Sequence, residues 1–285
     1  MRTVIRLYFI IKDFSREMTK KNTSAFAASA AFFLFLSLVP LLMALCAILP
    51  YTPLTAENLI TAILKVIPGA IEGFVERVVY DVYERSAGTI TVFAIVTIWS
   101  AAKAMLALIQ GLNEVNDIEE KRGYILLRFV ACLYTIIMLI AILISIFIMV
   151  FGNVIVNVAL KDFPNLKLIV QLVMRFRFIF SWLVLTLIFA LIYSLIPAIK
   201  QKFKTQLPGA AFSAVVWSAA SYVFSVYIDS FNGFGTYGSL TTVVILMFWF
   251  YMMMYILLIG AHMNRYFGPV YKLLFGWLDK SAKTH

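Results

Sequence analysis

One lysine stands alone in an uncharged stretch that runs from Ala87 to Asn113. A charged side chain at the centre of a membrane helix costs about 2.5–3.5 kcal/mol on insertion scales, and such residues tend to face a cavity. Two interpretations of Lys103 stay open: its ammonium binds an anionic group, or it bonds to carbonyls and hydroxyls between helices. In the first case Lys103→Met weakens binding or transport and leaves expression intact.

Further polar side chains inside apolar stretches are candidates for lining a cavity or binding a substrate. Four of them carry hydroxyls at helical spacing, where a polar path and a hydrogen-bonded seam between helices have the same pattern. The complete set of candidates is Ser37, Lys103, Asn113, Ser218, Ser221, Tyr222, Ser225 and His262.

Groups that catalyse reactions are sparse in this chain. The only histidines are His262 and His285, so the sequence offers neither a zinc site nor a histidine-based triad. No Asp or Glu lies securely inside an apolar stretch, so a carboxylate proton relay is not visible. We therefore predict no enzyme, no metal and no cofactor. One acidic cluster, which adjoins two basic residues and is typical of a solvated helix end, consists of Glu114, Asp117, Glu119 and Glu120.

Helix-breaking residues indicate where the backbone could bend. Pro40 has no N–H, so we expect a kink in its apolar stretch and a freed carbonyl that Ser37 or a neighbouring helix satisfies. Gly235 and Gly238 lie in a connection without Lys or Arg, which suits a tight turn or a hinge.

These residues belong to a chain whose composition excludes most soluble proteins. Hydrophobic residues make up 63% of its 285 residues and charged residues 13%, whereas soluble domains average about 45–50% and 25%. No linker, repeat or change in composition marks a second domain. The sequence predicts a single integral membrane domain over residues 1–285.

Apolar stretches long enough to cross a bilayer recur along the chain, since a spanning helix needs about 20 residues. They predict an all-α, polytopic membrane protein with a six-transmembrane-helix bundle. Amphipathic patterns predict an interfacial N-terminal helix at 1–23 and a helical outer loop between the first two spans. The predicted spans are about 24–49, 88–112, 129–159, 177–199, 207–229 and 238–264, and 265–285 is the predicted cytoplasmic tail.

Basic residues predict the orientation of the spans. Most of the 24 Lys and Arg residues lie in segments on the N-terminal side of the membrane, and cytoplasmic loops normally carry this excess. Both termini are therefore expected in the cytoplasm, with the protein in the inner or cytoplasmic membrane. Insertion explains most of the net charge of +10, so the expected partner is the lipid bilayer and not nucleic acid.

Short fragments in a fixed order along nearly the whole chain point to a known family. They are Ser37-Leu38-Val39-Pro40, Leu112-Asn113, Tyr193 through Pro197, Pro208-Gly209-Ala210, Tyr237-Gly238-Ser239, and Gly260-Ala261 with Asn264. In these fragments the chain resembles the YihY/BrkB family of membrane proteins. The resemblance implies six helices, cytoplasmic termini and a link to virulence and envelope integrity. His262 stands where members commonly carry an acidic residue, so no role of that carboxylate is carried over.

The leading prediction is a transporter or translocator of a lipid or other amphiphilic envelope component. A non-transporting membrane scaffold for envelope assembly is the alternative, and the membrane-associated ribonuclease implied by an older family label, ribonuclease BN, ranks last. A polar cleft leading to Lys103 would favour translocation, and a solid bundle with Lys103 at the interface would favour a scaffold. The substrate, the coupling ion and a homo-oligomeric state stay open.

Overall fold

A computed structural model describes residues 2–48, 57, 60, 61, 64, 73, 76, 77, 80, 87–141, 177–230 and 238–281. Within them the regular structure is helical, which confirms the all-α prediction for this part of the chain. The helices are α1 (Arg2–Lys20), α2 (Thr23–Ile48), α5 (Ala87–Val115), α8 (Arg177–Leu195), α9 (Phe203–Ser230), α10 (Gly238–Ser281) and a further helix, Tyr124–Ala141.

Among the described helices, three are apolar and long enough to cross a membrane: Tyr124–Ala141, Phe203–Ile228 and Val243–Gly268. Thr23–Leu38 and Ser181–Leu195 are shorter apolar helices. The count of six spans stays a prediction, because residues 142–159 of the third expected span lie outside the described residues.

Two helix ends differ from the predicted span ends. The helix α8 stops at Leu195, since Pro197 has no N–H and disfavours helical geometry at the residue before it. The helix α10 continues to Ser281, so most of the expected C-terminal tail is helical. In the outer loop only single residues are described, and they are helical; its amphipathic character stays a prediction.

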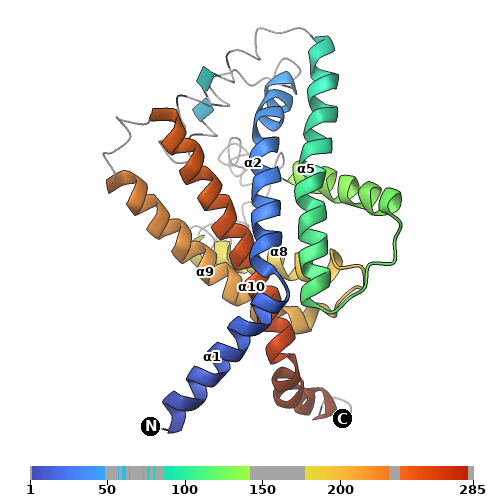
Figure 1. Cartoon of the computed structure of the whole chain (residues 1–285), viewed down its shortest axis with the longest axis vertical. Helices are drawn as coiled ribbons and strands as arrows, with labels where there is room; N and C mark the ends of the chain where they lie inside the picture. Colours follow the sequence, from blue (N-terminus) through green and yellow to red (C-terminus); the bar gives the residue numbers. More distant parts are fainter. Residues whose placement is uncertain are drawn as a thin grey trace, which may run out of the picture.

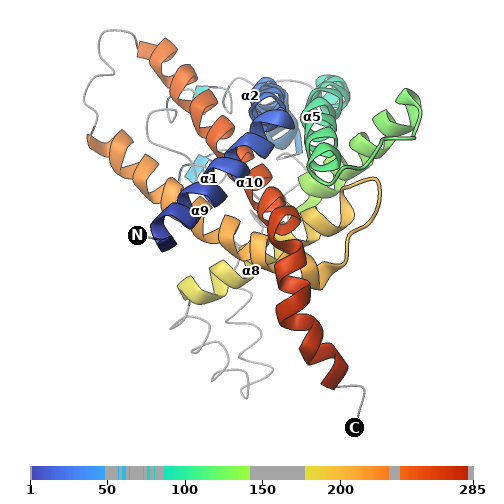
Figure 2. The same cartoon turned by 60° about the horizontal axis from the view of Figure 1, so that its bottom comes forward.

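The helices form an open arrangement and not a parallel bundle (Figure 1). The helices α2 and α5 lie side by side, α10 contacts α2, α5 and α9, and α8 packs against α9. Tyr124–Ala141 runs across α5 (Figure 1). We call the end where α2 begins, α5 ends and α9 begins the basal end; α1 and the last turns of α10 project from it (Figures 1 and 2).

A sharp change of direction joins α1 to α2. Asn22 has a left-handed backbone, with φ at 49°, a conformation that asparagine tolerates better than most residues. Its carbonyl then accepts from the N–H groups of Ala25 and Phe26 in the first turn of α2. Exposed apolar side chains on α1 are compatible with the predicted interfacial position, which stays a prediction; they are Tyr8, Phe9, Ile10 and Ile11.

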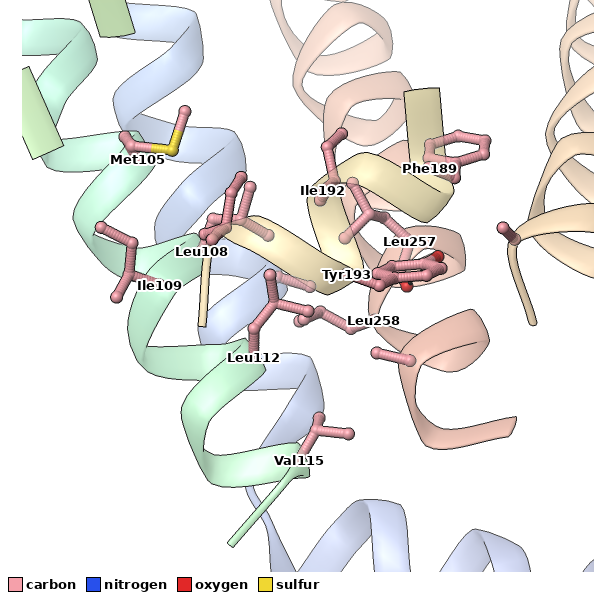
Figure 3. Close-up of a cluster of buried hydrophobic side chains, with 14 of the residues drawn as sticks. Met105, Leu108, Ile109, Leu112, Val115, Phe189, Ile192, Tyr193, Leu257 and Leu258 are labelled. Atoms are coloured by element: carbon pink, nitrogen blue, oxygen red, sulfur yellow. Dashed lines mark hydrogen bonds between the residues drawn. The ribbon is translucent and has the colours of Figure 1, made fainter. Parts of the chain in front are cut away.

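The hydrophobic core lies where α5, α8 and α10 meet (Figure 3). One face of α5 contributes Leu108 and Leu112, α8 contributes Ile192, and α10 contributes Leu257 and Leu258. Each of these side chains is at least nine-tenths buried. A buried leucine or isoleucine stabilises a fold by about 1.5–3 kcal/mol, so this cluster fixes α10 against α5 near the basal end.

Two glycines allow α9 and α10 to approach closely. A Cβ on Gly209 would collide with the carbonyl oxygen of Gly260. A Cβ on Gly260 would collide with the Ser213 hydroxyl and lie 2.5 Å from the Tyr193 hydroxyl. We call this contact the glycine crossing. Glycine is required on both helices because the backbones themselves meet there.

Candidate functional site

A polar cavity of about 470 Å³ opens at the basal end. Four segments far apart in sequence form it: the α1–α2 junction, the turn after α5, the start of α9 and the middle of α10. The basic-residue count predicted all four for one side of the membrane, and here they meet at one place. The lining residues are Glu17, Lys21, Asn116, Asp117, Gln201, Thr205, Gln206, His262, Asn264, Arg265, Tyr266 and Gly268.

Two cations converge on one carboxylate in this cavity. Lys21 Nζ donates to Asp117 Oδ1 at 2.6 Å, and Arg265 Nη2 donates to Asp117 Oδ2 at 2.8 Å. The hydrogen bond from Lys21, and then that from Arg265, lower the pKa of Asp117, although partial burial opposes them. Lys21, whose side chain is 7% exposed, also donates to the Val115 carbonyl at 3.0 Å. Asp117 therefore joins the α1–α2 junction to α10 as an ionised carboxylate.

The backbone at the end of α5 presents Asp117 to these partners. The N–H of Asp117 donates to the Glu114 carbonyl at 3.2 Å, and the N–H of Ile118 donates to the Asn113 carbonyl at 2.9 Å. This is the Schellman pattern of helix termination, in which the left-handed residue is usually glycine. Here Asp117 occupies that position with φ at 54°. The chain thus keeps a carboxylate where glycine would fit the backbone better.

His262 contacts the α1–α2 junction. The Thr23 hydroxyl donates its hydrogen to the Met18 carbonyl at 2.9 Å, and its oxygen lies 2.7 Å from His262 Nε2. Because that hydroxyl has one hydrogen, the imidazole donates from Nε2, and Nδ1 is the acceptor nitrogen of the neutral ring. His262 is 2% exposed. Its ring therefore fixes α10 to the start of α2.

Asn264 satisfies backbone groups beside a proline. Pro208 lies inside α9, where it cannot donate a hydrogen bond and its ring crowds the carbonyl of Lys204. Asn264 Oδ1 accepts from the Gly209 N–H at 2.7 Å, and Nδ2 donates to the Gln206 carbonyl at 3.1 Å and to Gln206 Oε1 at 2.9 Å. One buried amide of α10 therefore holds the interrupted turn of α9.

A buried hydroxyl pair links three helices at the glycine crossing. The Tyr193 hydroxyl of α8 lies 2.8 Å from Ser213 Oγ of α9 and donates to the Leu257 carbonyl of α10 at 2.8 Å. Ser213 Oγ also lies within donating distance of the Ile256 carbonyl of α10, at 3.3 Å. Both side chains are at most 1% exposed, so loss of either hydroxyl removes buried hydrogen bonds between helices.

Asn113, in the last turn of α5, bonds to the turn that follows α5 and to the segment that follows α8. Its Oδ1 accepts from the Ala198 N–H at 2.8 Å, and its Nδ2 donates to Glu120 Oε2 at 2.9 Å. Glu120 also accepts hydrogen bonds from Arg122, from Nε at 2.7 Å and from Nη2 at 2.6 Å. The hydrogen bonds from Arg122 lower the pKa of Glu120, against partial desolvation. Two acids that the sequence analysis interpreted as solvated, Asp117 and Glu120, are in fact paired with bases.

An apolar groove of about 610 Å³ lies between α9 and α10 beyond the glycine crossing. The two helices diverge there (Figure 2). The rings of Phe224 and Trp249 lie 6.3 Å apart across the two helices. The groove is lined by Val216, Ala219, Ala220, Val223, Phe224, Tyr227, Val244, Ile245, Phe248 and Met252.

The structure brings one of the predicted site residues into the polar cavity, His262. Asn113 lies beside the cavity, and its side chain bonds to Glu120 and to the Ala198 N–H. Lys103 is exposed on α5, with its Nζ 5.2 Å from the centre of the Phe33 ring, and it lines none of the cavities described above. Its role in binding an anion stays a prediction.

The Ser37 hydroxyl donates to the Leu34 carbonyl at 2.7 Å. It does not reach the Leu36 carbonyl that Pro40 deprives of a partner, because a helical serine bonds to carbonyls three or four residues back. The helix α2 continues through Pro40. The predicted kink there stays a prediction.

The predicted hydroxyl row on α9 lies away from the polar cavity. Ser218 donates to the Ala214 carbonyl of its own helix at 2.8 Å. Ser221 is half-buried, and Tyr222 and Ser225 are exposed. Of the two predicted hinge glycines, Gly238 is the first residue of α10, and Gly235 lies outside the described residues.

Several residues of the site were not predicted, above all Lys21, Asp117, Gln206 and Arg265. Asn264 appeared only within the family fragments. A usable signal existed for Asn264, since an amide inside an apolar stretch needs partners. Within the described residues, no group of three or more His, Cys, Asp or Glu side chains could hold a metal ion.

Comparisons with known proteins agree with this architecture. A family model described as virulence factor BrkB matches residues 14–271. The Bacillus subtilis (strain 168) protein named ribonuclease-like protein YfkH is 31% identical over 259 residues, which cover 90% of this chain and 94% of that protein. No solved structure matches the chain significantly. The family match confirms the resemblance found in the sequence: the chain belongs to the BrkB family.

Proposed function

We propose that this chain translocates a lipid or another amphiphilic envelope component across the inner or cytoplasmic membrane, with both termini in the cytoplasm. The observation that carries the proposal is the pair of cavities on α9 and α10. The polar cavity, of about 470 Å³, lies at one end of these helices, and the apolar groove, of about 610 Å³, lies beyond the glycine crossing. Together they offer a polar site and an apolar path to one amphiphile.

The separation of the two cavities supports this proposal. Val216, the first lining residue of the groove on α9, is ten residues past Gln206, which lines the polar cavity, and this corresponds to about 15 Å along a helix. A phospholipid is longer than this separation, so a bound head group in the polar cavity leaves its chains within reach of the groove. The glycine crossing, where the backbones of α9 and α10 meet, lies between the two cavities.

Reconstitution tests this function. Vesicles that contain the purified chain should expose an inner-leaflet fluorescent lipid to an external quencher faster than empty vesicles. Arg265→Gln, in the cavity, should slow this exposure, and Lys12→Gln, on the exposed face of α1, should not. Lys103→Met tests the remaining anion-binding prediction in the same assay. No acceleration with neutral, zwitterionic or anionic lipids would refute translocation.

The second candidate, a membrane scaffold, is favoured by one observation. Lys103 is exposed over Phe33 and lines neither cavity, which matches the expectation for a scaffold more than that for a transporter. A scaffold would leave lipid movement at the level of empty vesicles. It would also retain its envelope partners during purification in mild detergent, which a translocator does not require.

The ribonuclease interpretation rests on the older family label and on the name of YfkH. Asp117 and Glu120 belong to the one acidic cluster that could serve a nuclease, and both are engaged with basic side chains. Cleavage of RNA by the purified chain, lost in Asp117→Asn, would establish that activity.

A further inference from the structure

The arrangement of Lys21 and Arg265 is that of an anion-binding site. The two side chains come from different elements and end on the two oxygens of one carboxylate, at 2.6 and 2.8 Å. Ammonium and guanidinium groups that converge in this way also bind phosphate, with short charge-assisted hydrogen bonds. The cavity continues beyond the carboxylate and offers further hydrogen-bonding side chains, those of Asn116, Gln201 and Thr205.

The carboxylate is the more exposed partner of the pair with Lys21. The side chain of Asp117 is 57% exposed, whereas that of Lys21 is 7% exposed and that of Arg265 is 54% exposed. The buried ammonium is also held by the Val115 carbonyl. If the surface turn moved away, Lys21 would keep Glu17, whose Oε1 lies 3.7 Å from Lys21 Nζ, but Arg265 would lose the carboxylate with which it is paired. An anion that replaces Asp117 restores this lost opposite charge, so the departure of Asp117 is favoured when such an anion binds.

The charge balance of the cavity indicates what kind of anion fits. Lys21 and Arg265 carry two positive charges, and Glu17 and Asp117 carry two negative ones. A phosphodiester carries one negative charge, so its exchange for the Asp117 carboxylate keeps the cavity neutral. A neutral head group would leave one cation without a partner.

We propose that Lys21 and Arg265 form a binding site for a phosphate group and that Asp117 is an internal ligand which the phosphate displaces. This proposal rests on the proposed function, because it takes the head group of the amphiphile as the source of the phosphate. It adds the substrate class, an anionic phospholipid. It also assigns a role to Asp117, whose carboxylate occupies the site when no phosphate is bound.

The test measures binding to the purified full-length chain in detergent, with calorimetry and two soluble probes, inorganic phosphate and dihexanoyl phosphatidylglycerol. Arg265→Gln should weaken binding about tenfold, the effect of one charge-assisted hydrogen bond. Asp117→Asn should tighten binding several-fold, because it removes the competing carboxylate; asparagine also tolerates the left-handed backbone. Lys12→Gln removes a positive charge outside the cavity and should bind like the unchanged chain. Circular dichroism and a melting curve verify that each variant is folded.

Each outcome decides the proposal. If Asp117→Asn binds either probe equally or more weakly, the internal-ligand proposal is overturned, because Asp117 then only supports the fold. Failure of both probes to bind the unchanged chain overturns it as well. Binding of inorganic phosphate without the lipid supports the site and identifies free phosphate as its ligand. If the variants behave as expected but reconstituted vesicles move no lipid, the phosphate site stands and the proposed function fails.

Discussion

Replacement of Asn264 by alanine should destabilise the protein through α9, a helix that lies far from Asn264 in sequence. Asn264 makes three hydrogen bonds, one to the Gly209 N–H and two to Gln206. Hydrogen bonds between membrane helices contribute about 0.6 kcal/mol each, so their loss removes about 2 kcal/mol. This raises the unfolded fraction about 30-fold. Equilibrium unfolding of the purified chain in mixed detergent, followed by tryptophan fluorescence, measures the change.

A double-mutant cycle with Pro208→Ala tests the reason for this loss. An alanine at this position supplies the missing N–H and lets the turn of α9 close by itself. Asn264→Ala should then cost about 1 kcal/mol less than it does beside the proline, a coupling that double-mutant cycles resolve. The control Asn116→Ala removes a single bond to the Leu112 carbonyl and should cost below about 1 kcal/mol. Equal costs of Asn264→Ala in both backgrounds would refute the reasoning.

Three further predictions follow from the same geometry. Gly260→Ala should reduce the yield of folded protein, because its Cβ would collide with side chains of α8 and α9. The control Gly268→Ala should melt like the unchanged chain, because no neighbouring atom lies within 4 Å of its Cβ. The pKa of Asp117 is lowered from its ordinary value of 3.8, so its ion pairs stabilise the fold fully at a pH above 3.8. This stabilisation disappears as the pH falls through the folded-state pKa. Between pH 7 and pH 2 the melting temperature of Asp117→Asn should therefore fall less than that of the unchanged chain. Asn113→Ala removes the bonds from the end of α5 to Glu120, in the turn after α5, and to Ala198, after α8, and trypsin should then cleave after Lys121 faster, as timed by electrophoresis.

The sequence predicted the helices because their lengths follow from local composition. The first span was expected at about 24–49, and α2 covers Thr23–Ile48. An uncharged apolar stretch has few alternatives to a helix in a bilayer, since every backbone group must bond within its own segment. The basic residues predicted that the loop segments lie on one side of the membrane; that these segments meet at the basal end was not predicted.

The partners of Asp117 could not be predicted from its local sequence. Its neighbours are acidic and basic residues, which is typical of a solvated turn, yet its partners Lys21 and Arg265 lie 96 and 148 residues away. Helix packing alone brings them together. Lys103 is a second residue whose surroundings could not be predicted: the sequence left open whether it binds an anion or bonds between helices, because a single residue in a helix gives no information on which side it faces. Ala102 and Ala104 are buried, and Lys103 between them is exposed.

The basic residues of this chain serve two different purposes, which the total charge conceals. Most lie in the flanking segments, as at Lys12 and Lys202, which are exposed, and the predicted orientation assigns these residues to membrane insertion. Lys21 and Arg265 differ, because each is matched by an acid within the cavity and adds nothing to its net charge. A neutral cavity with paired charges attracts anions weakly from a distance and discriminates among those that enter. Under the proposed exchange at Asp117, selectivity depends on that exchange and responds little to the overall charge of +10.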